Sequence, residues 1–123
     1  MNQEKINDSS KEFIRANTIT DLLIEKQVED VLLLDLQSFH TFTDFFIIGT
    51  VDNVRQSKTV SDLIHKQKDI FTNGAVIQDG NSDSGWTLLD VGGIVIHLFT
   101  RDTREYYDLE SLWSDAKTIL RIH

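Results

Sequence analysis

The sequence contains no cysteine and no proline. Without cysteine, disulfides, thiolate nucleophiles and thiolate metal ligands are excluded, and the composition fits a reducing cytoplasm, where we expect the protein to act. Without proline, no predicted helix or strand is interrupted by a residue that lacks a backbone N–H. The longest apolar runs, Val31–Leu34 and Gly92–Leu98, have the length of strands and fall short of the roughly 20 residues of a membrane span. The N-terminal segment Met1–Glu12 has the features of neither a signal peptide nor a transit peptide.

Positive charge is also scarce. Twelve Lys and Arg stand against 20 Asp and Glu, which gives a net charge of −8. This balance argues against broad binding to phosphate backbones, because such binding depends on clustered cations that displace counterions. A basic protein surface is the better electrostatic match, although net acidity can also serve solubility alone.

The most informative segment is Gly85–Phe99, in which Gly92-Gly93 separates two apolar runs. A Gly-Gly pair between β-rich segments is typical of a two-residue hairpin turn, because both central residues of a type I′ turn need a positive φ. In that register one face is almost wholly apolar and suits a core, and it carries Thr87, Leu89, Val91, Ile94, Ile96 and Leu98. The opposite face, called the mixed face below, carries Trp86, Leu88, Asp90, Val95, His97 and Phe99. The mixed face is expected either to be covered by a helix or to be partly open to a partner.

Capping signals and helical spacing predict three helices. Ser9-Ser-Lys-Glu12 fits a capping box that starts a helix over about residues 9–26. Asp52-Asn53 can cap a second helix over about residues 54–71. Apolar residues at helical spacing predict a third helix over about residues 107–120.

Apolar runs without helical periodicity predict the other strands. Val31–Leu36 and Asp44–Val51 are apolar on both faces over much of their length, as central strands are, and Ala75–Gln78 can add a short strand. With 123 residues the chain suffices for one domain. We therefore expect an α+β fold, a single domain over residues 9–121 in which a mixed β-sheet is flanked by α-helices, with residues 1–8 as a flexible N-terminus.

Three aspartates, Asp35, Asp44 and Asp90, stand on or at the ends of predicted strands. Such carboxylates could bind magnesium, which makes a magnesium-dependent nucleotidyl or phosphoryl transferase the alternative function. However, the sequence lacks the close Asp-x-Asp pair of polymerase-type nucleotidyltransferases and any glycine-rich phosphate loop. Strand-end Asp more often bonds local backbone amides. We therefore expect no enzyme, no metal and no cofactor.

The four histidines show no metal-binding spacing. His97 and Asp90 are diagonal neighbours on the mixed face, so a hydrogen bond between them is geometrically possible. No nucleophile is fixed against this pair, since Ser82 and Ser84 lie in a polar loop. A structural or recognition role for His97 is therefore favoured over catalysis.

Four aromatic residues, Trp86, Tyr106, Tyr107 and Trp113, gather in the C-terminal third of the chain. Trp113 lies on the apolar stripe of the third predicted helix, so we expect it to pack in the core. Trp86 directly follows a polar loop at a strand edge, where an amphipathic aromatic side chain can anchor an interface. The sequence leaves open whether Trp86 is buried or exposed.

Several motifs occur together in this chain, namely Gly85-Trp86, Leu88-Leu89-Asp90, Val95-Ile96-His97-Leu98-Phe99, Arg104-Glu-Tyr-Tyr-Asp-Leu-Glu-Ser-Leu-Trp113 and, upstream, Thr43–Ile48 and Arg55-Gln56. This combination covers about residues 9–120 and resembles the signature of the ribosomal silencing factor family, RsfS or Iojap-like. It is far more specific than any of its pieces.

The resemblance implies a mixed sheet flanked by helices, distantly similar to nucleotidyltransferases but without their catalytic pattern. It implies a non-enzymatic repressor of translation that binds the large ribosomal subunit through the universal large-subunit protein numbered fourteen. Binding there would block joining of the small subunit when nutrients are scarce. Because the chain is acidic, we expect a basic ribosomal protein as the direct contact, without sequence-specific nucleic-acid or membrane binding. An open mixed face would also suit a homodimer off the ribosome.

We expect the partner-binding surface to combine the mixed face with the segment that follows the hairpin. Its expected residues are Trp86, Leu88, Asp90, His97, Phe99, Arg104, Tyr106 and Tyr107. The sequence departs from the family pattern at Gly93, where an acidic residue usually stands. This departure either weakens a contact to a cation or only tightens the turn.

Overall fold

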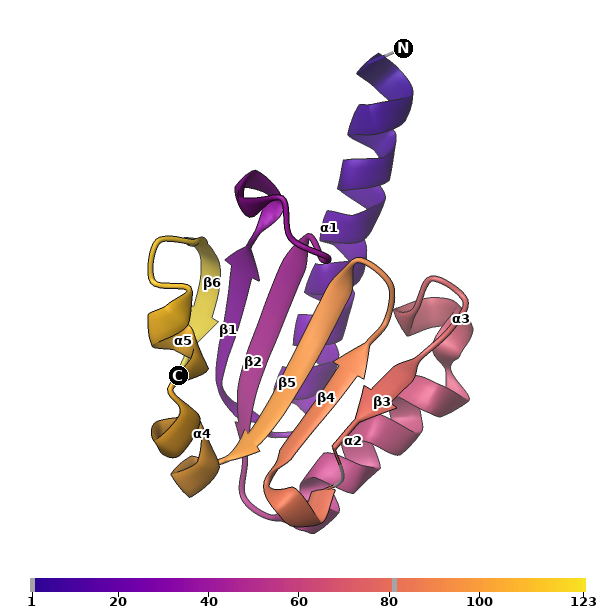
Figure 1. Cartoon of the computed structure of the whole chain (residues 1–123). Coiled ribbons are helices and arrows are strands. Elements are labelled where there is room, and N and C mark those ends of the chain that lie inside the picture. Colours follow the sequence, from indigo (N-terminus) through magenta and orange to yellow (C-terminus); the bar gives the residue numbers. More distant parts are fainter. Residues whose placement is uncertain (1, 81) are drawn as a thin grey trace.

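One six-stranded mixed sheet, in the order β3-β4-β5-β2-β1-β6, organises the computed structural model (Figure 1). The structure describes residues 2–80 and 82–123, and for residues 2–10 and 82 it describes the backbone alone. The strands are β1 (Glu29–Asp35), β2 (Phe45–Val51), β3 (Ile77–Asp79), β4 (Trp86–Asp90), β5 (Ile94–Thr100) and β6 (Lys117–Ile122). The α-helices are α1 (Asn2–Glu25), α2 (Val54–Lys66), α3 (Lys68–Phe71), α4 (Arg101–Tyr107) and α5 (Leu109–Leu112), with short 3₁₀ turns η1 (Gln37–Phe39) and η2 (Ser82–Ser84). Only the β2–β5 pair is parallel among the described strand pairs, so the predicted α+β fold with a mixed sheet is confirmed.

The helices α1 and α2 cover one face of the sheet, which lies in front of them in Figure 1. Between these two helices and the sheet lies an aliphatic cluster that includes Ile19 of α1, Ile64 of α2, and Ile47 and Ile96 of the sheet, all fully buried. Burial of apolar surface of this kind is the main stabilising contribution in a domain of this size. Among residues 2–80 and 82–123, no helix has the length and apolar character that crossing a bilayer requires.

The hairpin of β4 and β5 has the predicted register. Its residue pairs are Trp86 with Phe99, Thr87 with Leu98, Leu88 with His97, Leu89 with Ile96 and Asp90 with Val95. The backbone N–H of Val91 donates to the carbonyl of Ile94 at 2.9 Å, which closes the two-residue turn. Both turn glycines have positive φ, +85° at Gly92 and +81° at Gly93, as a type I′ turn requires. The predicted core face is buried along its whole length.

The tip of this hairpin is held by α1. The Arg15 guanidinium donates to the carbonyl of Val91 at 2.7 Å and to the carbonyl of Gly92, and it also pairs with Glu12. A Cβ atom at Gly93 would collide with the Glu12 carboxylate. The glycine at position 93 therefore has a steric role, because it makes room for the ion pair beside the turn.

The starts and ends of the first two predicted helices differ from the structure. Asn53 caps α2 as predicted, since its side chain accepts from the backbone N–H of Gln56 at 2.9 Å. The helix breaks at Gln67, however, and a separate short helix follows. The predicted start at a Ser9 capping box was wrong, because α1 begins at Asn2. That residues 1–8 are flexible stays a prediction.

The third predicted helix was also wrong. Its residues divide into α4, α5 and the edge strand β6. Asp108 adopts a left-handed conformation with φ +47° and its N–H donates to the carbonyl of Arg104, which ends α4. The segment Lys117–Ile122 instead pairs with β1, whose outer backbone groups would otherwise lack partners.

Candidate functional site

The mixed face is covered by aromatic side chains, whereas the opposite face of the sheet is covered by the helices α1 and α2. Successive ring centroids lie 4.6 Å apart for Phe46 and His97, 4.9 Å for Trp86 and Phe99, and 4.8 Å for Trp86 and Tyr107. The whole group, called the aromatic face below, consists of Phe39, Phe42, Phe46, Trp86, His97, Phe99, Tyr106, Tyr107 and Trp113. These contacts join β2, β4, β5 and α4 into one continuous packed layer.

The aromatic face is buried at its centre and exposed at its ends. His97 and Phe99 are 3% and 0% exposed, whereas Tyr107 and Tyr106 are 50% and 82% exposed. Trp86 is half-buried between these two groups. His97 and Phe99 thus lie beneath the surface of the free protein, and their expected part in partner binding stays a prediction. At the end of the aromatic face that α4 forms, the accessible surface comes from Trp86, Tyr106 and Tyr107.

A shallow recess lies beside Trp86. It has a volume of about 240 Å³, and its apolar lining comes from Trp86, Leu88 and Tyr107. The polar lining comes from Asp79 at the end of β3, from Gly80 and from Ser84 of η2. A recess of this kind can accept an apolar side chain of a partner against the indole ring.

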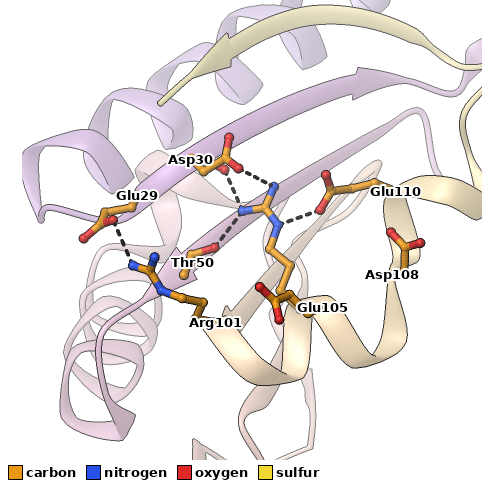
Figure 2. A pocket seen from close by; sticks show the side chains of 8 residues that line it. Glu29, Asp30, Thr50, Arg101, Glu105, Asp108 and Glu110 are labelled. Atoms are coloured by element: carbon orange, nitrogen blue, oxygen red, sulfur yellow. Dashed lines mark hydrogen bonds and ion pairs between the residues drawn. The ribbon is translucent and has the colours of Figure 1, made fainter.

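Arg104 fixes α4, and with it the two tyrosines, against the sheet. Its Nη1 donates to the backbone carbonyl of Asp30 at 2.7 Å and to Oγ1 of Thr50 at 2.8 Å. Its Nε donates to Oε1 of Glu110 at 2.6 Å (Figure 2). The Arg104 side chain is 9% exposed, so its charge is compensated in a mostly dry environment. Arg104 is thus a buried anchor of the site and contributes little accessible surface.

A second arginine ties β6 into the same cluster. Arg121 donates from Nε and Nη2 to the two carboxylate oxygens of Asp30, both at 2.9 Å. This hydrogen bond from Arg121, together with the positive charge of Arg104, holds the pKa of Asp30 below its ordinary value, although partial burial acts in the opposite direction. The cluster therefore joins β1, α4, α5 and β6 through charged groups.

The acidic recess of Figure 2 lies around this cluster, between β1 and α4. Its volume is about 340 Å³, and its charged lining consists of Glu29, Asp30, Glu105, Asp108 and Glu110 with Arg101 and Arg104. Carboxylates outnumber guanidinium groups here, so the recess suits a cationic group of a partner. It shares α4 with the exposed tyrosines, which places acidic and aromatic surfaces side by side.

The predicted hydrogen bond between Asp90 and His97 was wrong. Oδ1 of Asp90 accepts from the backbone N–H of Gly92 at 3.0 Å, within the hairpin turn. His97 is bonded to Trp86 instead, whose Nε1 donates to Nδ1 of His97 at 3.2 Å. Burial lowers the pKa of His97 to about 4, so the imidazole is neutral near pH 7.

Sequence reasoning missed the contribution of β2 to this surface. Phe46 pairs with Val95 across the parallel β2–β5 pair, which puts its ring on the mixed face, and Trp113 packs on Phe46 at 5.5 Å. Phe42 is 75% exposed beside Phe46 and extends the aromatic face away from Trp86. Trp113 packs in the core as predicted, although it follows α5 and does not lie in a long helix.

The aspartates of the alternative function act within turns or beside them. Oδ1 of Asp35 accepts from the backbone N–H of Gln37 at 2.9 Å, and Asp90 caps its own turn as described. Asp44 lies next to Gly93. Among the side chains that the structure describes, those of residues 11–80 and 83–123, no three His, Cys, Asp or Glu are grouped as metal ligands would be.

Comparison with known proteins identifies relatives along most of the chain. A family model described as "Ribosomal silencing factor during starvation" matches residues 7–123. The ribosomal silencing factor RsfS of Bacillus subtilis is 35% identical over 94 residues, which cover 75% of this chain and 78% of that protein. A mouse protein named mitochondrial assembly of ribosomal large subunit protein 1 is 27% identical over 99 residues, 78% of this chain and 43% of that protein.

The fold also has a solved counterpart. A crystal structure of a Chromobacterium violaceum protein superposes with a TM-score of 0.72 at 24% identity, covering 81% of this chain and 83% of that one. The arrangement of strands and helices described above is thus one that a solved structure shares.

Proposed function

Because this chain belongs to the ribosomal silencing factor family, a family of translation regulators, we propose that it binds the large ribosomal subunit and blocks joining of the small subunit. The direct contact in this proposal is the universal large-subunit protein numbered fourteen. The protein would act in the cytoplasm as a repressor of translation under nutrient limitation. It would do so by occupying space and not by catalysis.

The accessible end of the aromatic face carries this proposal. The rings of Trp86 and Tyr107 pack in a tilted arrangement with their centroids 4.8 Å apart, and Tyr106 adds a ring that is 82% exposed. Large, partly ordered aromatic side chains are the most frequent anchors of protein interfaces, because they bury much area for little loss of conformational freedom. Such a group on the surface of a single domain is suited to docking.

The carboxylates around this end favour a basic partner. The acidic recess borders the same helix that carries the two tyrosines, and the whole chain has a net charge of −8. Opposite charge at an interface rim speeds association and selects among partners. A basic ribosomal protein satisfies both requirements, whereas bare phosphate backbones would be repelled.

Co-sedimentation tests the proposal directly. Purified protein is mixed with large subunits and centrifuged through a sucrose gradient, and we expect it to migrate with the subunits. Addition of small subunits should then yield fewer joined ribosomes than in a sample without the protein. Protein that stays at the top of the gradient, or normal subunit joining with the protein bound, would refute the proposal.

A further inference from the structure

His97 is a polar residue in the centre of the aromatic face. It lies on β5 opposite Leu88 and is 3% exposed. The centroid of its ring lies 4.6 Å from that of Phe46, in a T-shaped arrangement, and 6.2 Å from that of Phe99, whose ring is nearly parallel to it. An aliphatic or phenyl side chain would fill this position without the cost of burying a polar group.

The hydrogen bond to Trp86 defines the protonation of this histidine. An indole N–H can only donate, so Nδ1 of His97, at 3.2 Å from Trp86 Nε1, must accept through its lone pair. A neutral imidazole that accepts at Nδ1 carries its proton on Nε2. Among the described residues Nε2 has no hydrogen-bond partner, and the ring whose centroid lies nearest to that of the imidazole is Phe46, at 4.6 Å.

Ring stacking alone would not define the orientation of the Trp86 indole. The centroids of the Phe99 and Tyr107 rings lie 4.9 and 4.8 Å from that of the indole, both rings are tilted against it, and an indole rotated about its side-chain bonds could keep such contacts. The bond to Nδ1 is directional, so it selects one orientation. An interface anchor that is ordered before docking loses less entropy when it binds.

We propose that His97 is a positioning residue for partner binding, a neutral Nε2-protonated imidazole that fixes the Trp86 indole for docking. This inference rests on the proposed function. His97 itself does not touch the partner. It makes the accessible edge of Trp86 and the recess beside it a preformed surface.

A pair of variants separates this role from simple packing. His97→Asn keeps an acceptor near the place of Nδ1, whereas His97→Leu removes it, and both remove the imidazole ring. In the free protein, the Trp86 indole N–H should exchange with solvent about tenfold faster in His97→Leu than in wild type. His97→Asn should restore most of the protection. The indole N–H of Trp113 serves as the internal reference in the same spectrum.

Binding to large subunits completes the test. We expect His97→Leu to bind about tenfold more weakly than wild type and His97→Asn to recover much of that loss. In a Trp86→Phe background, which lacks the indole donor, the two His97 variants should bind alike. Thermal unfolding of each variant identifies any that fail to fold, and the exchange measurement on wild type still reports the bond.

The outcomes separate the two proposals. If wild-type protein does not bind large subunits, the proposed function fails whatever the indole does. If wild type binds and His97→Leu binds equally well, or if the Trp86 N–H exchanges freely in wild type, the positioning role of His97 is wrong.

Discussion

The two faces of the sheet are closed by different kinds of interaction. Behind the sheet, α1 and α2 bury a cluster of aliphatic side chains in which many similar contacts share the stabilisation. The other face is closed by aromatic rings, by the short helices α4 and α5 and by a cluster of charged groups. A few directional bonds hold these parts together. Apolar packing tolerates small losses, whereas a buried ion cluster fails when one member is removed. The comparison indicates that the first face spreads its stabilisation over many similar contacts, while the second concentrates it in a few groups.

The largest expected effect comes from removing the buried arginine. Arg104→Ala removes the guanidinium that the carbonyl of Asp30, Oγ1 of Thr50 and Oε1 of Glu110 accept from, so the free energy of unfolding should fall by about 4 kcal/mol. Binding to large subunits should fall too, because α4 loses its anchor. Denaturant titration measures the stability.

Arg101→Ala is the matched control on the same helix. Arg101 pairs with Glu29 at 3.3 Å, but both side chains are largely exposed. Its loss should change the free energy of unfolding by less than about 0.5 kcal/mol. Equal effects of the two substitutions would contradict the role assigned to the buried cluster.

The free energy of unfolding should fall in mild acid because of a group in the aromatic face. The pKa of His97 is lowered from 6.5 to about 4 by burial, so the unfolded chain binds a proton more readily in this range. The stabilising contribution is complete above about pH 6.5 and is lost as pH falls to about 4. The total amounts to about 3 kcal/mol. Unfolding titrations across this range should show the slope in wild type and a shallower slope in His97→Asn.

Asp30 should act at lower pH. Its pKa lies below the ordinary 3.8, so its contribution is retained until pH falls below that value. A wild-type slope between pH 6.5 and 4 that persists unchanged in His97→Asn would show that another group causes it.

Removal of the half-buried anchor Trp86 should weaken binding beyond what its loss of packing costs in stability. Trp86→Ala is expected to weaken binding to large subunits by about 2 kcal/mol, roughly 30-fold, as measured by titrated co-sedimentation. Ile70→Ala, which changes an apolar side chain that is 57% exposed on α3, should leave affinity unchanged. An equal loss of affinity in both variants would show that the interface does not lie on the aromatic face.

The smallest effect is expected behind the sheet. Ile96→Val removes one buried methyl group and should lower the free energy of unfolding by about 1 kcal/mol. Affinity for large subunits should stay as in wild type, because the change faces α1 and α2. A drop in affinity with this variant would show that the two faces are not independent.

Local signals predicted the parts of the fold that short-range geometry decides. The Gly92-Gly93 turn sets the hairpin register through backbone conformation, and Asn53 caps α2 through its own side chain. The segment Lys117–Ile122 was misassigned because apolar residues near it recur at helical spacing, while the open edge of β1 decides its conformation.

The site was only partly predictable for the same reason. Trp86, Leu88 and Tyr107 do meet in one recess, as the resemblance implied that they contribute to one surface. Which group His97 bonds was not decided by sequence, because both Trp86 and Asp90 lie near it on one face. The burial of Arg104 depends on Asp30 and Glu110, which the sequence gives no reason to bring together.

The pairing of β6 with β1 has a consequence for how the protein is made. Val31 pairs with Ile122, so the sheet joins segments that lie far apart in the sequence. During synthesis, β1 emerges early and must wait until residue 122 has left the ribosomal exit tunnel. Until then its outer edge is open to pairing with other chains, and the cluster of Asp30, Arg104 and Arg121 is not assembled. A nascent chain therefore lacks the bonds from Arg121 to Asp30 until β6 has been added.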